Sequence, residues 1–324
     1  MDLRNALSRV VDATLEATVV GSFTDVGINA RRHLGDWQDL DSIDATGRVV
    51  LVTGATSGLG LATVRQLARM GASVRLVGRD AGKAEAARAD VEAAAPGADV
   101  ATYLADMSNL TEVRRLVAEV LERETRLDVL VHNAGALLAE RRETADGHEM
   151  TFATMVLGPF ALTEGLRPLL ERTGGARVIT VSSGGMYTQK LAIDDLESEH
   201  EYRGSVAYAR AKRAQVVLTE QWAEHDRTGA ITFHAMHPGW AATPGVHDAL
   251  PKFERVLGSR LRSPAEGADT IVWLAVADEP TRASGRFWLD RRPRGTHRVP
   301  STRESSEDRA RLWDFVTAAT KPPA

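Results

Sequence analysis

The feature that most constrains this chain is a run of apolar residues that leads directly into a glycine-rich turn. Residues 49–52 read as a buried strand, and Gly54, Gly58 and Gly60 follow it. Gly54 allows a sharp turn off the strand, and Gly58 and Gly60 lack the β-carbons that would keep a pyrophosphate away from a helix N-terminus. Apolar residues at helical spacing follow up to Gly71, which reads as a C-cap. A strand, a glycine-rich turn and a helix in this order predict a dinucleotide-binding site.

Length and composition restrict the classes of function. The 324 residues suffice for one large α/β domain, and a net charge of −4 gives no basic surface for nucleic acid. The chain has no cysteine, which excludes thiolate metal sites and a cysteine nucleophile, so redox chemistry depends on a bound cofactor. No stretch approaches the roughly 18 apolar residues of a membrane-spanning helix, and charged residues interrupt the N-terminus where a signal peptide needs an apolar block. We expect a cytoplasmic protein with a small-molecule substrate, no bound metal and no nucleic-acid partner.

Beyond the glycine-rich turn, apolar strands alternate with amphipathic helices. Such near-continuous apolar strands predict a parallel sheet covered by helices on both faces. We expect one Rossmann-type, doubly wound α/β domain at 47–290, an N-terminal helical extension at 1–46, and a C-terminal extension with a terminal helix at 291–324. The C-terminal extension opens with a run of arginines that we interpret as a solvated face or loop. The further strands are expected at 74–77, 100–104, 128–132, 177–181, 231–236 and 286–289.

The N-terminal extension carries an apolar pattern of its own. Leu3, Leu7, Val10, Val11 and Leu15 fall on one helical face, which predicts an amphipathic helix over roughly residues 2–20. We favour the interpretation that this face packs on the domain or on a second subunit. Because the polar face mixes acids with bases, docking on an anionic membrane surface is the less favoured alternative.

The residue that follows the second strand indicates which of the two nicotinamide cofactors, NAD(H) or NADP(H), the site prefers. About 20 residues after the last glycine of the turn, an NAD enzyme places a carboxylate for the ribose 2′-hydroxyl. This chain has Arg79 there. A guanidinium can instead pair with a 2′-phosphate in a charge-assisted contact. We therefore expect NADP(H) to be preferred over NAD(H).

Two groups of side chains supply candidate chemistry. Tyr208 and Lys212 are four residues apart on a predicted helix and share one face. An ammonium beside a phenol favours the phenolate, which brings the tyrosine pKa closer to the working range of an acid/base. Ser182 and Ser183 follow the strand at 177–181, where a hydroxyl faces the ligand crevice of an open α/β sheet. At least one of the two serines is expected to be a turn-capping residue.

These residues together resemble the short-chain dehydrogenases/reductases over about residues 47–290. The resemblance implies a single doubly wound domain with a seven-stranded parallel sheet, NAD(P)(H) at the strand ends, and reversible oxidation of an alcohol to a carbonyl. The separation between Ser183 and Tyr208 is similar to that of the retinol-dehydrogenase-like branch. The motifs that carry the resemblance are Thr53-Gly54-x-x-x-Gly58-x-Gly60, Asp106, His132-Asn133-Ala134-Gly135, the Ser183 region, Tyr208-x-x-x-Lys212 and Pro238-Gly239.

The resemblance also implies a role for each site residue. Tyr208 is the proton donor, Lys212 lowers its pKa and binds the ribose, and Ser183 orients the substrate. Asp106 holds the adenine, residues 133–135 pass under the adenosine ribose, and the segment from Pro238 to Thr243 faces the nicotinamide. The full set of expected cofactor contacts is Gly54, Thr56, Ser57, Gly58, Leu59, Gly60, Arg79, Asp106, Met107, Asn133, Ala134, Gly135, Tyr208, Lys212, Pro238, Gly239, Trp240 and Thr243.

One residue departs from the family pattern. Met155 stands where the family usually has an asparagine that helps to hold a proton-relay water, and a thioether cannot replace an amide as donor. Three interpretations remain open: another group serves the relay, turnover is slow, or the protein binds cofactor without ordinary catalysis.

The leading hypothesis is an NADP(H)-dependent alcohol dehydrogenase or carbonyl reductase that acts on an apolar small molecule. Apolar residues on segments expected around the crevice favour such a substrate, although they suit the core equally well. The alternatives are a catalytically weak nucleotide-binding protein that engages a partner and a lipid-associated reductase docked by residues 2–20. A homodimer or homotetramer is compatible with the resemblance. The apolar residues are Met155, Met186, Tyr187, Leu191 and Trp240.

Overall fold

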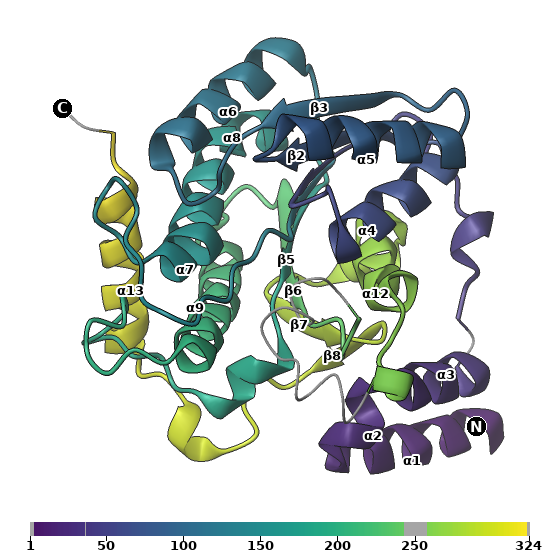
Figure 1. The fold of residues 1–324 in the computed structure, drawn as a ribbon. Coiled ribbons are helices and arrows are strands. Elements are labelled where there is room, and N and C mark those ends of the chain that lie inside the picture. Colours follow the sequence, from purple (N-terminus) through teal and green to yellow (C-terminus); the bar gives the residue numbers. More distant parts are fainter. Residues whose placement is uncertain (1–2, 36, 243–257, 323–324) are drawn as a thin grey trace.

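The computed structural model describes residues 3–35, 37–242 and 258–322, and it is organised around one twisted sheet of eight strands (Figure 1). The strand order is β3-β2-β1-β4-β5-β6-β7-β8, and β1 to β7 pair in parallel. The order reverses beside β1, as in doubly wound sheets. The strands are β1 (Val49–Thr53), β2 (Ser73–Gly78), β3 (Val100–Leu104), β4 (Val129–His132), β5 (Ala176–Val181), β6 (Ile231–Met236), β7 (Arg286–Leu289) and β8 (Arg292–Arg294).

Helices cover both faces of this sheet. The helices α4 (Gly58–Arg69), α5 (Ala81–Ala94) and α12 (Pro264–Val276) pack against one face, where their apolar side chains form one core cluster with β1 and β2. The helices α6 (Leu110–Arg123), α8 (Gly158–Thr173) and α9 (Gly204–His225) form a second cluster on the other face. The terminal helix α13 (Ser306–Thr320) packs outside α8 and α9. The doubly wound α/β architecture predicted from the sequence is therefore confirmed.

The sheet differs from the expected seven parallel strands by one short edge strand. β8 pairs antiparallel with β7, with Leu289 opposite Arg292. It lies in the arginine run that we interpret from the sequence as a solvated face or loop, and that interpretation is wrong for Arg291 and Arg294, although Arg298 is exposed. Arg291 is buried and makes two hydrogen bonds with the carboxylate of Asp269, while Arg294 binds Asp12 through two nitrogens. These arginines are buried because carboxylates from elsewhere in the chain neutralise them.

The N-terminal extension forms three helices instead of the single helix expected over 2–20. The first, α1 (Leu3–Ala17), ends before Thr18, which has extended backbone angles. The short α2 (Val19–Phe23) and then α3 (Asp25–Leu34) follow, and the three helices pack on one another below the β8 edge of the sheet (Figure 1). Thr24 separates the last two helices, again in extended conformation.

The orientation of α1 differs in part from the expected one: Val11 and Leu15 are half-buried, but two residues of the same apolar face are not. Leu7 and Val10 are 52% and 63% exposed, whereas the acids Asp12 and Glu16 face the protein and bind Arg31. Paired charges therefore replace apolar burial as the main contact of this helix with the domain, and the expectation that its apolar face packs inward is wrong for these two residues. No helix among the described residues combines the length and the apolar character needed to cross a bilayer.

Candidate active site

The residues predicted to bind cofactor and substrate follow the carboxyl ends of neighbouring strands. The glycine-rich turn follows β1, Asn133 follows β4, Ser183 follows β5 and His237 follows β6. Because these strands are parallel and adjacent, their carboxyl ends lie along one edge of the sheet. This edge is where open α/β sheets bind ligands.

The glycines of the turn are required first by packing within the protein. A β-carbon on Gly54 would lie 2.9 Å from the Cα of Ala134, and Gly54 also has a φ of +65°. A β-carbon on Gly60 would lie 2.3 Å from the carbonyl oxygen of Gly54 and 2.6 Å from the amide nitrogen of Asn133. The sequence analysis explains Gly60 by the approach of a pyrophosphate, but the contacts show that the turn itself already excludes a side chain there.

Thr53 and Asn133 fasten the turn to the loop after β4. The Thr53 hydroxyl accepts the backbone N–H groups of Asn133 and Ala134 at 3.0 and 3.1 Å. The Asn133 side chain in turn donates to the carbonyl oxygens of Thr53 and Gly54 at 3.0 and 3.1 Å. The side-chain amide of Asn133 is thus used in hydrogen bonds within the protein, and it holds the loop after β1 and the loop after β4 together.

Arg79 and Asp106, the two charged residues expected at the adenosine end, lie beside each other. A nitrogen of Arg79 is 3.9 Å from the Asp106 carboxylate, and the Arg79 side chain is 78% exposed. The other carboxylate oxygen of Asp106 accepts hydrogen bonds from the backbone and hydroxyl of Ser108. Met107 is buried, and its carbonyl oxygen lies against Gly158, where a β-carbon would come within 2.1 Å.

The structure brings Tyr208, Lys212 and Ser183 together. Tyr208 and Lys212 lie on α9, with the Lys212 Nζ 5.4 Å from the centre of the Tyr208 ring, and Ser183 is near enough to Tyr208 to lower the pKa of the phenol. The two serines of the pair take different roles. Ser182 is buried and donates to the Lys212 carbonyl oxygen at 2.9 Å, so it ties α9 to β5. The Ser183 hydroxyl accepts the Gly185 N–H at 3.2 Å, so Ser183 is the turn-capping serine of the pair.

The electrostatics of this group differ from the expectation. Desolvation raises the pKa of Tyr208, and the hydrogen bond with Ser183 lowers that pKa only in part, so the net direction is upward. Burial lowers the pKa of Lys212 to about 7, and its Nζ donates to the Val181 carbonyl oxygen at 2.7 Å. The protein surroundings therefore favour the neutral phenol at Tyr208, whereas the sequence analysis expects Lys212 to shift this pKa downward.

Met155 lies in a π-helical turn, Ala153–Leu157, that opens into α8. Its side chain is fully buried, and its sulfur lies 3.6 Å from where a β-carbon on Gly135 would be. Its carbonyl oxygen accepts a hydrogen bond of 2.7 Å from Gln215. Gln215 stands three residues after Lys212 on α9 and was not predicted, although this spacing on the same helix face could have indicated it.

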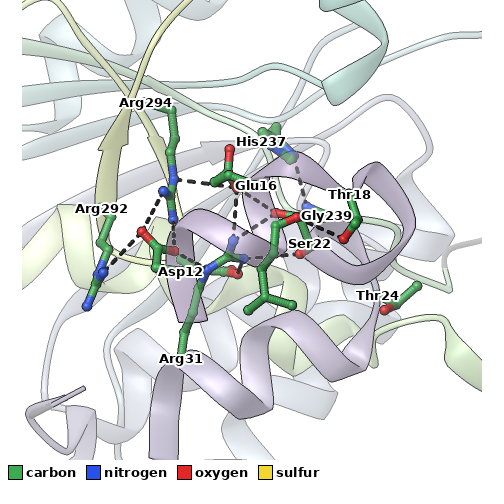
Figure 2. Close-up of polar contacts among 12 residues, drawn as sticks. Asp12, Glu16, Thr18, Ser22, Thr24, Arg31, His237, Gly239, Arg292 and Arg294 are labelled. Carbon is green, nitrogen blue, oxygen red and sulfur yellow. Dashed lines mark hydrogen bonds and ion pairs between the residues drawn. The ribbon is translucent and has the colours of Figure 1, made fainter. Parts of the chain in front are cut away.

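The loop after β6 forms the other end of the site. His237 accepts a hydrogen bond from the Gly239 backbone, and Gly239 has a φ of +73° (Figure 2). A β-carbon on Gly267 of α12 would meet Leu59 of the glycine-rich turn, Ala241 and Pro238 within 3.6 Å, so this loop adjoins the turn. Thr243 lies outside the described residues.

Most of the apolar residues that the sequence analysis offers as crevice-lining belong to the core. Met155, Met186, Tyr187 and Leu191 are all buried, and only Trp240 is half-buried. Tyr187 spends its hydroxyl on the Gly295 carbonyl oxygen at 2.8 Å.

Comparisons with known proteins agree with this geometry. The model of the short chain dehydrogenase family matches residues 48–252. The human protein dehydrogenase/reductase SDR family member 12 is 46% identical over 266 residues, which cover 82% of this chain and 83% of the relative. Human retinol dehydrogenase 14 is 36% identical, with 83% and 85% coverage. Among solved structures, the Pseudomonas aeruginosa RhlG/NADP active-site complex has a TM-score of 0.62 at 26% identity, with 75% of this chain and 94% of that chain covered.

Proposed function

Because the chain belongs to the short-chain dehydrogenase/reductase family of oxidoreductases, we propose that it interconverts an alcohol and a carbonyl group with NADP(H) as its preferred cofactor. The observation that carries this proposal is the convergence of Ser183, Tyr208 and Lys212 at the edge of the sheet where the parallel strands end. Three polar groups from two elements converge there, which is the arrangement needed to bind a substrate oxygen and exchange its proton.

The residues at the adenosine end fit such a cofactor. The first turn of α4 begins at Gly58, and the side chain of its N-cap residue Ser57 makes no capping hydrogen bond, which leaves backbone N–H groups for phosphate oxygens. This turn includes Gly54, Thr56, Leu59 and Gly60. Residues 133–135 lie beside it in the proposed binding site. Arg79 would bind the 2′-phosphate, with Asp106 and Met107 beside the adenine, while Lys212 would bind the ribose and residues 238–240 would border the nicotinamide.

A bound nicotinamide cofactor supplies the hydride donor or acceptor. The residues of this chain supply the proton and position the substrate oxygen that receives it. In the reductive direction, the neutral phenol of Tyr208 donates its proton to the substrate oxygen, and Ser183 donates a hydrogen bond to the same oxygen. The raised pKa of Tyr208 keeps this proton in place before the reaction. We further propose an apolar substrate, as the name of the similar retinol dehydrogenase implies for that relative.

The test begins with cofactor binding, because it requires no knowledge of the substrate. Calorimetric titration of the protein with NADPH and NADH is expected to give tighter binding of NADPH. Turnover is then measured as NADPH oxidation with a panel of apolar aldehydes and ketones. Tyr208→Phe is expected to lower turnover about 100- to 10,000-fold with little change in NADPH affinity. Full activity of Tyr208→Phe contradicts the assigned role.

A second function, nucleotide-dependent binding of a partner with little turnover, is favoured by the surroundings of Met155. The side-chain amide expected at this position is absent, and the Met155 carbonyl oxygen already accepts a hydrogen bond from the Gln215 side chain. Met155→Asn distinguishes the two functions: a large gain in turnover supports weak native catalysis, whereas ready turnover by the unmodified protein supports the oxidoreductase.

A further inference from the structure

A short segment of the N-terminal extension, residues 22–24, lies against the loop after β6 and is bonded to it through main-chain groups. We name this segment the 22–24 strap. The backbone N–H of Trp240 donates to the Phe23 carbonyl oxygen at 2.7 Å. Arg262 donates to the carbonyl oxygens of Ser22 and Thr24 at 2.9 and 3.1 Å, and also to that of Pro238 at 3.1 Å. One guanidinium therefore holds the strap and the loop together.

The Phe23 ring contacts both loops that border the proposed reaction centre. The ring is 3% exposed, and its centre lies 4.4 Å from that of His237 and 5.7 Å from that of Trp240. On its other side it meets Gly184, where a β-carbon would come within 2.5 Å of a ring carbon. Gly184 directly follows Ser183. Phe23 thus fills the space between the Ser183–Gly184 segment after β5 and the 237–240 loop after β6.

Buried charges hold the strap in this place. Asp290 lies between Arg31 of α3 and Arg262, at 2.6 Å from each, and all three side chains are 1% exposed. Arg31 also donates to the Ser22 carbonyl oxygen at 3.1 Å and binds Asp12 and Glu16 of α1 (Figure 2). A buried carboxylate shared by two guanidinium groups gives strong, directional contacts. The strap therefore sits in one position relative to Arg262 and the loop.

We propose that the 22–24 strap is a positioning element of the active site, with Phe23 setting the conformation of the 237–240 loop and of Gly184 against the nicotinamide end of the cofactor. This inference rests on the proposed function, since it requires that NADP(H) binds along the sheet edge. Among the described residues, the strap forms no hydrogen bond or ion pair with Arg79 or Asp106 at the adenosine end. Its effect is accordingly confined to the half of the cofactor that the 237–240 loop receives.

The test compares a whole cofactor with its adenosine half. Phe23→Leu keeps an apolar side chain but loses the ring contacts with His237 and Trp240. Titration calorimetry of this variant is expected to show NADPH binding weakened about tenfold. Binding of adenosine 2′,5′-bisphosphate, which lacks the nicotinamide half, stays within about twofold of the unmodified protein. With any carbonyl substrate found in the panel, kcat is expected to fall more than KM rises, because misplaced reacting groups cost rate.

Two further variants keep the result interpretable. Phe315→Leu makes the same change in a ring on α13 that packs against Phe152, and it is expected to alter neither ligand. Gly184→Ala places a methyl group against the Phe23 ring from the opposite side and is expected to weaken NADPH selectively, as Phe23→Leu does. The double variant is expected to lose less than the two single variants combined, because the leucine makes room for the methyl group.

The outcomes separate the two proposals. If the unmodified protein binds neither ligand, the proposed function fails, and this inference fails with it. If it binds both and Phe23→Leu binds both as tightly with unchanged kcat, the positioning role alone is overturned. Equal weakening of both ligands in Phe23→Leu also overturns it, because the strap would then act on general stability.

Discussion

The two ends of the proposed cofactor site are built in different ways. The adenosine end consists of short motifs that each follow one strand, and its contacts join near neighbours in the sheet, as between Thr53 and Asn133. Its charged side chain Arg79 is exposed. The nicotinamide end is held by the buried residues Phe23, Arg262 and Asp290, of which Phe23 is more than 200 positions from the other two along the chain. The adenosine end is therefore built from local sequence motifs at the strand ends. The nicotinamide end depends on tertiary contacts between segments far apart in the sequence.

The largest expected effect lies at the buried end. Asp290→Asn keeps the side-chain volume and tolerates the positive φ of this residue, but it removes the charge shared by Arg31 and Arg262. Urea unfolding is expected to show a loss of about 3 to 5 kcal/mol, because two guanidinium groups stay buried without their shared counterion. The variant is also expected to weaken NADPH more than adenosine 2′,5′-bisphosphate.

The matched control is Asp99→Asn, at the opposite edge of the sheet. Asp99 pairs with Arg75 at 2.9 Å, but its own side chain is 60% exposed. Loss of this pair is expected to cost less than about 1 kcal/mol. Similar losses in the two variants would contradict the claim that burial of the Asp290 contacts is what makes them costly to lose.

The exposed end is tested by Arg79→Ala. Loss of a charge-assisted contact with the 2′-phosphate is expected to cost about 1.5 to 3 kcal/mol of NADPH binding. NADH lacks this phosphate, so its affinity in calorimetry is expected to change by less than about 0.5 kcal/mol. Arg126→Ala, which removes an exposed arginine paired with Asp128 before β4, serves as the control and leaves both cofactors unaffected. Equal losses for NADPH and NADH in Arg79→Ala would refute the assignment.

The smallest expected effect concerns the pH dependence of stability at two buried histidines. Burial lowers the pKa of His132 in β4 to about 3, and burial together with the charges of nearby arginines holds the pKa of His237 well below its usual value. Between the unfolded value near 6.5 and these folded values, only the unfolded chain binds the proton. Stability therefore falls as pH falls through this range, by about 1.4 kcal/mol per pH unit for each histidine.

Urea unfolding at pH 7.5, 6.5 and 5.5 measures this slope. His132→Gln is expected to reduce the slope by one proton. If the nicotinamide end is as dry as the interior of the sheet, His237→Gln reduces it equally. An unchanged slope in His237→Gln would show that this end is open to water and would weaken the contrast between the two ends.

The comparison also explains what the sequence could predict. The strand, turn and helix around Gly54 and the pairing of Tyr208 with Lys212 are written in short spacings, so the fold and the residues of the proposed chemical centre follow from local patterns. The direction of the Tyr208 pKa could not, because desolvation depends on everything packed around the ring.

The helix at the start of the N-terminal extension was predictable, but the way in which it packs was not, for a related reason. The apolar pattern of α1 indicates a face turned toward the protein, yet Leu7 and Val10 point to solvent. The orientation of α1 is set instead by Asp12 and Glu16, because these acids bind Arg31 and Arg294 in the folded chain. No spacing within residues 1–46 carries information about arginines near residue 290.

The contact between Arg31 and Asp290 spans 259 positions of the chain. Contacts of such long sequence separation pay a large loop-closure cost and form late in folding. During synthesis, Arg31 can pair with Asp12 and Glu16 of its own segment early, but it meets Asp290 only after the segment around residue 290 has left the ribosome. The glycine-rich turn can therefore assemble early, while the 22–24 strap is fixed against the 237–240 loop only once Asp290 is in place.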